Sequence, residues 1–122
     1  MSREMKTPGP DHPITVEKNP ARVTVRVGDQ VVADTTAALV LQESNYPPVQ
    51  YIPLADVDPA AIKPTDTSTY CPYKGDASYY TLVTQDGEVK DAIWTYRTPY
   101  PAVAEIADHV AFYPDKVEIT QS

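Results

Sequence analysis

The densest group of reactive side chains is the segment Cys71-Pro72-Tyr73-Lys74-Gly75-Asp76. Its proline and glycine predict a tight loop, and a loop fixed at the mouth of a β scaffold is a common place for a site. Cys71 is a candidate nucleophile, because nearby positive charge favours the thiolate and Lys74 is three residues away. Lys74 is also a candidate for holding an anionic ligand. A buried, purely structural Cys71 is the competing interpretation.

Glu43 and the two histidines are further candidates for proton transfer. Glu43 ends an apolar run, so it is either an acid or base with a shifted pKa or the partner of a surface arginine. His109 follows a predicted helix, where it either takes part in catalysis or caps carbonyl groups. We expect His12, in a proline-rich segment, to be exposed, and we predict no metal site because the ligand spacing is missing. We expect Glu43, Lys74 and His109 to share one cleft.

Tyrosine is unusually frequent, with nine residues against one phenylalanine and one tryptophan. A buried tyrosine needs a partner for its hydroxyl, so clusters of tyrosine are typical of partly wet pockets and interfaces. We therefore predict an aromatic cleft beside the Cys71–Asp76 loop. Its candidate ligand-binding residues are Tyr73, Lys74, Asp76, Tyr79, Trp94 and Tyr96.

The elements that must position these residues are mostly short strands. Alternating valines over 23–27, a Gly28-Asp29 turn and an Asp86-Gly87 turn indicate two hairpins. Thirteen prolines exclude a mostly helical chain, and the one predicted helix covers 101–108. We predict a flexible N-terminal arm (1–13) and a single β domain (14–122). The expected fold is mostly β, with seven or eight antiparallel strands in tent-like or barrel-like sheets.

Composition excludes several classes of function. The 122 residues carry a net charge of −7, so nucleic-acid binding is not expected. No apolar segment is long enough to span a membrane, and we expect a cytoplasmic protein without a bound cofactor, since no glycine-rich phosphate loop is present. A lone cysteine fits a reducing compartment. Homo-oligomerisation stays open.

Several motifs occur together in a characteristic order. They are Pro8-Gly9-Pro10-Asp11-His12-Pro13-Ile14, Tyr46-Pro47-Pro48-Val49-Gln50-Tyr51-Ile52-Pro53, Cys71 to Ala77, Trp94-Thr95-Tyr96 and His109 to Tyr113. With them the chain resembles the bacterial family catalogued as domain of unknown function 427. The resemblance implies a tent-like β fold but no established activity. Zinc ligands of tent-like relatives are missing here, and so are the paired aspartates that the family's nucleotidyltransferase-like label would require.

Three functions follow as hypotheses. The first is the binding of a small molecule, for which an anion is one option, in the aromatic cleft, with Lys74 and Glu43 as polar anchors. The second is an enzyme in which Cys71 is the nucleophile, or in which Lys74 and a carboxylate transfer protons. The third is a scaffold for protein interaction, which would present a large tyrosine patch or form a homodimer.

Overall fold

The computed structural model describes residues 5–122, and within this range the chain is mostly β. Three 3-10 segments, η1 (Leu54–Asp56), η2 (Pro59–Ala61) and η3 (Pro101–Ile106), connect the strands. The strands are β1 (Ile14–Lys18), β2 (Val23–Val27), β3 (Gln30–Thr35), β4 (Leu39–Glu43), β5 (Val49–Pro53), β6 (Ile62–Cys71), β7 (Gly75–Thr84), β8 (Gly87–Thr95), β9 (His109–Phe112) and β10 (Glu118–Gln121).

These strands form two open antiparallel sheets. The large sheet has the order β1-β4-β5-β9-β8-β7-β6, and the small sheet has the order β10-β2-β3. Both glycine-containing turns form the predicted hairpins, because β2 pairs with β3 and β7 pairs with β8. The large sheet is not closed, so of the two expected shapes the open one is found.

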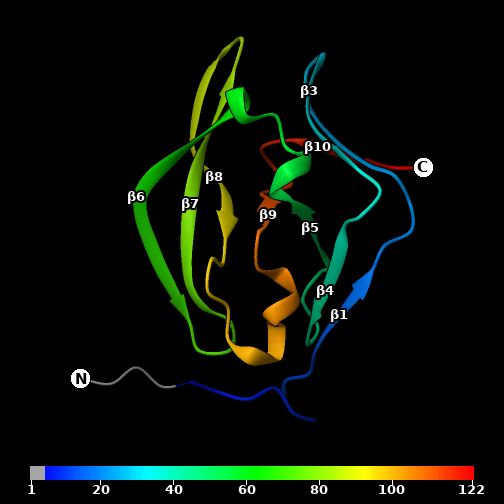
Figure 1. Ribbon diagram of the computed structural model, residues 1–122, viewed down its shortest axis with the longest axis vertical. Coiled ribbons are helices and arrows are strands. Elements are labelled where there is room, and N and C mark those ends of the chain that lie inside the picture. The colour runs from blue at the N-terminus through cyan, green and yellow to red at the C-terminus, as the bar shows by residue number, and fades with distance from the viewer. Residues whose placement is uncertain (1–4) are drawn as a thin grey trace.

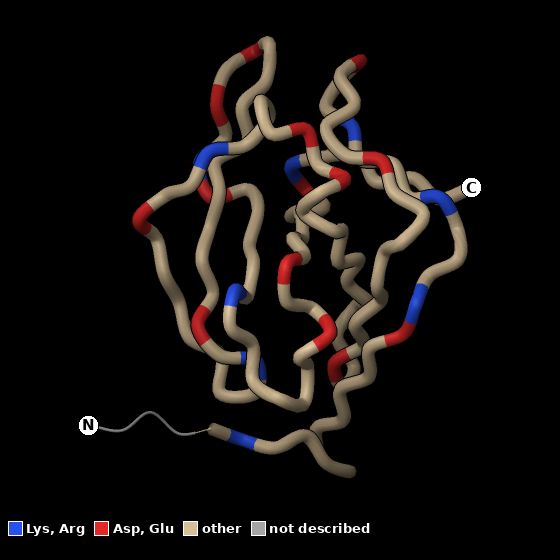
Figure 2. Tube along the Cα trace, in the orientation of Figure 1, with Lys and Arg blue, Asp and Glu red and all other residues tan. Residues whose placement is uncertain are grey.

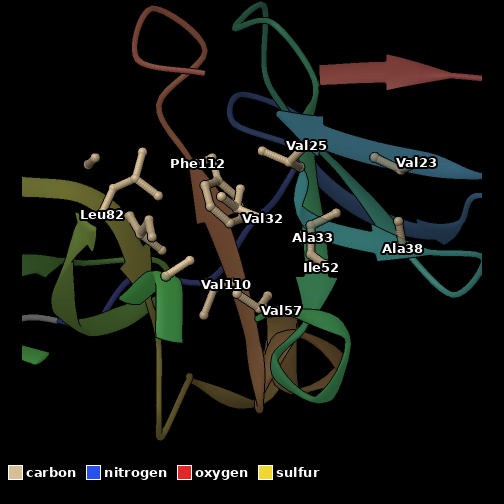
Figure 3. Close-up of a cluster of buried hydrophobic side chains, with 13 residues drawn as sticks. Val23, Val25, Val32, Ala33, Ala38, Ile52, Val57, Leu82, Val110 and Phe112 are labelled. Carbon is tan, nitrogen blue, oxygen red and sulfur yellow. The ribbon is translucent and has the colours of Figure 1, made fainter. Parts of the chain in front are cut away.

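The main core lies where the two sheets face each other. Figure 3 shows side chains of the small sheet, among them Val25 and Val32, close to Phe112 and Ile52 of the large sheet. In β2, Val23 and Val25 are buried in this core and the residue between them is more exposed, as the valine pattern predicts. In β3 the consecutive residues Val32 and Ala33 are both buried, so the alternation is interrupted there. A second buried cluster includes Leu41, Tyr51, Tyr96, Val103 and Ile106, and it lies beneath the candidate site.

The short helix predicted over 101–108 is present, but as a 3-10 segment that ends at Ile106. The structure has the 3-10 segment η3, which is interrupted at Val103, where φ is −129° and ψ is 29°. Six residues give few hydrogen bonds to offset the cost of starting an α-helix. Val103 and Ile106 are both buried, and their spacing of three residues matches the period of a 3-10 turn.

Charged residues are dispersed over the surface. Figure 2 shows lysine and arginine scattered among acidic residues along the described trace, without one continuous basic stripe. No helix within residues 5–122 is long and apolar enough to cross a membrane.

Candidate functional site

The loop between β6 and β7 fixes Lys74 at one end of the large sheet. The Lys74 amide donates to the Cys71 carbonyl at 3.2 Å, and the Tyr100 amide donates to the Lys74 carbonyl at 2.9 Å. Gly75 follows with φ at +109°, in a region that residues with a Cβ rarely adopt. The loop is therefore held from both sides, and the direction of the Lys74 side chain is fixed.

Glu43, the last residue of β4, joins this lysine to a histidine. The Lys74 ammonium (Nζ) donates to Oε1 of Glu43 at 2.7 Å, and Nε2 of His12 donates to Oε2 at 2.7 Å. The side chains of Glu43 and Lys74 are each 13% exposed, and that of His12 is 24% exposed. These three residues are called the His12–Glu43–Lys74 cluster below.

The cluster joins distant parts of the large sheet. β4 is second from one edge in the strand order, whereas β6 and β7 lie at the other edge. Figure 1 shows β1 and β4 on one side, β6 and β7 on the other, and the N-terminal segment passing below them. The Glu43–Lys74 ion pair therefore connects the two sides of an open, curved sheet at this end.

Backbone hydrogen bonds attach the N-terminal segment to this end and bring in His12. The Lys6 amide donates to the Pro72 carbonyl at 2.8 Å, and the Ser44 amide donates to the Pro13 carbonyl at 2.8 Å. The His12 ring stacks on Tyr73, with 4.1 Å between ring centroids and 10° between planes. The expectation of a merely exposed His12 is wrong, because stacking and the contact with Glu43 cover most of the imidazole.

Electrostatics keep Glu43 ionised. Burial by itself raises the pKa of Glu43, but the hydrogen bonds and charges of Lys74 and His12 outweigh burial and hold that pKa below its ordinary value. An ionised carboxylate only accepts hydrogen bonds, so Nε2 of His12 must carry the proton. In the neutral ring Nδ1 is then an acceptor, and it has no hydrogen-bond partner among residues 5–122.

A cavity of about 390 Å³ adjoins the cluster. It is lined by His12, Tyr73 and most residues from Met5 to Asp11, including Lys6. The imidazole therefore faces both a fixed carboxylate and a space of the size of small-ligand sites. Of the predicted ligand-binding residues, Tyr73 lines this cavity.

The structure places His109 apart from Glu43 and Lys74. His109 pairs with Pro53 at the end of β5, whereas Leu41, two residues before Glu43 in β4, pairs with Val49 at the start of β5. The ring Nδ1 donates to the Ala107 carbonyl at 2.8 Å. His109 thus makes the capping contact that was one of its two interpretations, and it does not join the other two residues in a cleft.

Three aromatic residues of the predicted cleft, Tyr79, Trp94 and Tyr96, lie in or against the second core cluster. Tyr96 is buried, and Nζ of Lys74 lies 5.6 Å from its ring centroid. The indole of Trp94 donates to the Tyr51 hydroxyl at 3.1 Å. Tyr79 pairs with Trp94 across β7 and β8, and its hydroxyl contacts Thr69 at 2.8 Å. These rings support the site from the sheet beneath it.

The other loop residues have simpler roles. Cys71 is half-buried and packs against the second core cluster. Asp76 is exposed and lies opposite Tyr70 in the β6–β7 ladder. Among residues 5–122, no group of three or more potential ligands is arranged to hold a metal ion.

His12 is the site residue that sequence reasoning missed. A signal for it exists, because prolines at 10 and 13 stiffen the segment around it and favour one fixed conformation. Its contact with Glu43 spans 31 residues of sequence, and no local pattern reveals a contact at that distance.

The fold and site define a small antiparallel β domain with a charged, half-buried cluster beside a cavity. Residues 15–122 match the family described as a domain of unknown function (DUF427), and the chain belongs to that family. The match includes Glu43 and Lys74 and begins three residues after His12. A search of curated proteins finds no match.

Proposed function

We propose that this domain binds a small molecule with an acidic group, such as a carboxylate or phosphate, in the cavity beside His12. The observation that carries the proposal is the His12–Glu43–Lys74 cluster, which fixes an imidazole at the wall of a cavity of about 390 Å³. Ligand sites are commonly pre-formed and contain a few oriented polar groups, and this cavity fits that description.

The lining of the cavity includes one basic residue, Lys6, and one acidic residue, Asp11. Glu43 already pairs with the Lys74 ammonium, so we assign the acidic group of the ligand to Lys6. The Tyr73 ring stacks on one face of the His12 imidazole and limits the movement of the imidazole.

The predicted acid–base enzyme has a specific observation in its favour as well. Lys74 contacts the carboxylate of Glu43, as the proton-transfer hypothesis requires, and an imidazole contacts the same carboxylate. For Cys71 as nucleophile the structure offers less support, because Glu43 binds the nearby ammonium. We further propose a cytoplasmic location, which a free, half-buried thiol supports.

Binding is tested by thermal unfolding with inorganic phosphate and with malonate. We expect at least one of these anions to raise the unfolding temperature of the natural chain. A ligand at 100 times its Kd adds about 2.7 kcal/mol. Lys6→Gln removes a charged hydrogen-bond donor, which is worth about 1.5–3 kcal/mol, so affinity should fall roughly tenfold or more.

Lys18→Gln is the matched control, because it changes the net charge equally but lies at a different cavity. It should leave the response to the anion unchanged. Equal responses in the Lys6 and Lys18 variants would show a general salt effect and contradict the proposed site. So would the absence of any response to both anions in the natural chain.

A further inference from the structure

The cluster has a feature that ligand binding does not require. Glu43 accepts hydrogen bonds through both carboxylate oxygens, one from His12 and one from Lys74, both at 2.7 Å. Its side chain is only 13% exposed, so it cannot easily rotate or exchange partners with water. The carboxylate thus fixes which imidazole nitrogen is protonated and the direction in which the other nitrogen points.

The other nitrogen, Nδ1, carries the reactive lone pair. It has no hydrogen-bond partner within residues 5–122, and the His12 ring lines the cavity. A histidine that only fastened the N-terminal segment would need neither a free nitrogen nor a neighbouring cavity. An imidazole that is oriented by a carboxylate is the arrangement that general-base catalysis uses.

We propose that His12 is a catalytic base for the hydrolysis of a small carboxylic ester bound in this cavity, with Glu43 and Lys74 as positioning residues. Nδ1 takes one proton from a water molecule while the water oxygen forms a bond to the carbonyl carbon. The C–O bond to the alcohol then breaks, the electron pair leaves with the alkoxide, and the alkoxide takes the proton from Nδ1. The products are one carboxylic acid and one alcohol, and the neutral imidazole is regenerated.

Three charged residues near His12 have a part in this step. The imidazolium that forms between the two proton transfers lies against the Glu43 carboxylate, which stabilises it. Lys74 keeps that carboxylate in place and ionised. Lys6 lines the same cavity and supplies positive charge for the negative oxygen that forms on the carbonyl group.

This inference rests on the proposed ligand cavity, but the two proposals are contradicted by different results. An uncharged ester, p-nitrophenyl acetate, serves as the probe, so its hydrolysis does not depend on anion binding. Loss of anion binding with intact ester hydrolysis would contradict the proposed ligand class alone. Intact anion binding without hydrolysis through His12 would contradict the catalytic base alone.

The experiment measures p-nitrophenolate release at neutral pH over many turnovers in a Cys71→Ser background. This background removes the thiol, which the same ester acylates. In it we expect His12→Ala to lower the protein-dependent rate by about 100-fold, within the usual range for general-base catalysis. His109→Ala is the matched control and should leave the rate unchanged. Free imidazole hydrolyses this ester by itself, so the rate of His12→Ala with imidazole is compared with that of the same imidazole solution without protein. An excess in the presence of His12→Ala is expected, and a purely structural His12 would give none.

Folding of each variant is checked by its thermal unfolding. If His12→Ala does not fold, Glu43→Gln replaces it, because this variant keeps His12 and loses the carboxylate that stabilises the imidazolium. Its rate should fall by about 10-fold or more, and its dependence on pH should change. The proposal is overturned if the folded His12 or Glu43 variant keeps the rate of its background, or if that background itself shows no turnover.

Discussion

Replacing Glu43 with leucine should destabilise the protein by about 3 kcal/mol, because it leaves the Lys74 ammonium without its carboxylate in a mostly buried position. Removing one partner of a buried ion pair typically costs about 3–5 kcal/mol, and the partial exposure of this pair places it at the lower end. The free energy of unfolding is measured in urea for the natural chain and the variant. In a domain of this size the same change lowers the unfolding temperature by roughly 10 °C.

A double-mutant cycle tests whether the unpaired Lys74 ammonium causes the loss of stability in Glu43→Leu. Lys74→Met in the Glu43→Leu background removes the unpaired charge, so the double variant should recover much of the lost stability. Glu88→Leu is the control, because it breaks the exposed Lys63–Glu88 pair, whose side chains are 54% and 53% exposed. It should cost less than about 1 kcal/mol. Equal costs for Glu43→Leu and Glu88→Leu would contradict a buried, structurally fixed cluster.

Replacing Gly75 with alanine should cost about 2–3 kcal/mol and displace Lys74. Its φ of +109° lies outside the left-handed region that alanine can enter at moderate cost. A Cβ at this position would lie 3.5 Å from the Thr98 carbonyl oxygen, which is an ordinary van der Waals contact, so the expected cost comes from the backbone conformation. The free energy of unfolding measures the strain, and the NMR signals of His12 report any displacement of the cluster.

Gly28→Ala provides the comparison for this prediction. Gly28 has φ at +58°, in the left-handed region, and no atom lies within 4 Å of a Cβ placed there. Gly28→Ala should lower the free energy of unfolding by about 1 kcal/mol, and the NMR signals of His12 should not change. If both glycine variants have the same small effect, the conformation of the Cys71–Gly75 loop does not fix Lys74.

Much of the fold could be predicted from local patterns. The valines of β2 share the core face and alternate with the more exposed Thr24 and Arg26, and the glycines at 28 and 87 adopt positive φ in the hairpin turns. The strands β1 and β6 were not predicted. β6 contains Pro64 and several threonines, and its pairing with β7 is interrupted between Pro64 and Ser68. Its strand conformation depends on that neighbour rather than on its own hydrophobic pattern.

The site could be predicted only in part, for a physical reason. The sequence indicates Lys74 and Glu43 separately, because one lies in a proline- and glycine-bounded loop and the other ends an apolar run. Their contact depends on the curvature of the large sheet, which brings opposite sides together at one end. His12 arrives from an irregular segment through backbone hydrogen bonds, and no periodic pattern specifies these. His109 has the same side chain, but its nearest acceptor is the backbone carbonyl of Ala107.

The most direct test of the account is the tautomer of each histidine, read from a two-bond ¹H–¹⁵N correlation spectrum at a pH that keeps both rings neutral. His12 should be protonated on Nε2, which faces Glu43, and His109 on Nδ1, which faces the Ala107 carbonyl. A His109→Gln variant assigns the signals. Opposite tautomers would show that the contact with Glu43 leaves the lone pair of His12 on Nδ1. A His12 protonated on Nδ1 would contradict the account.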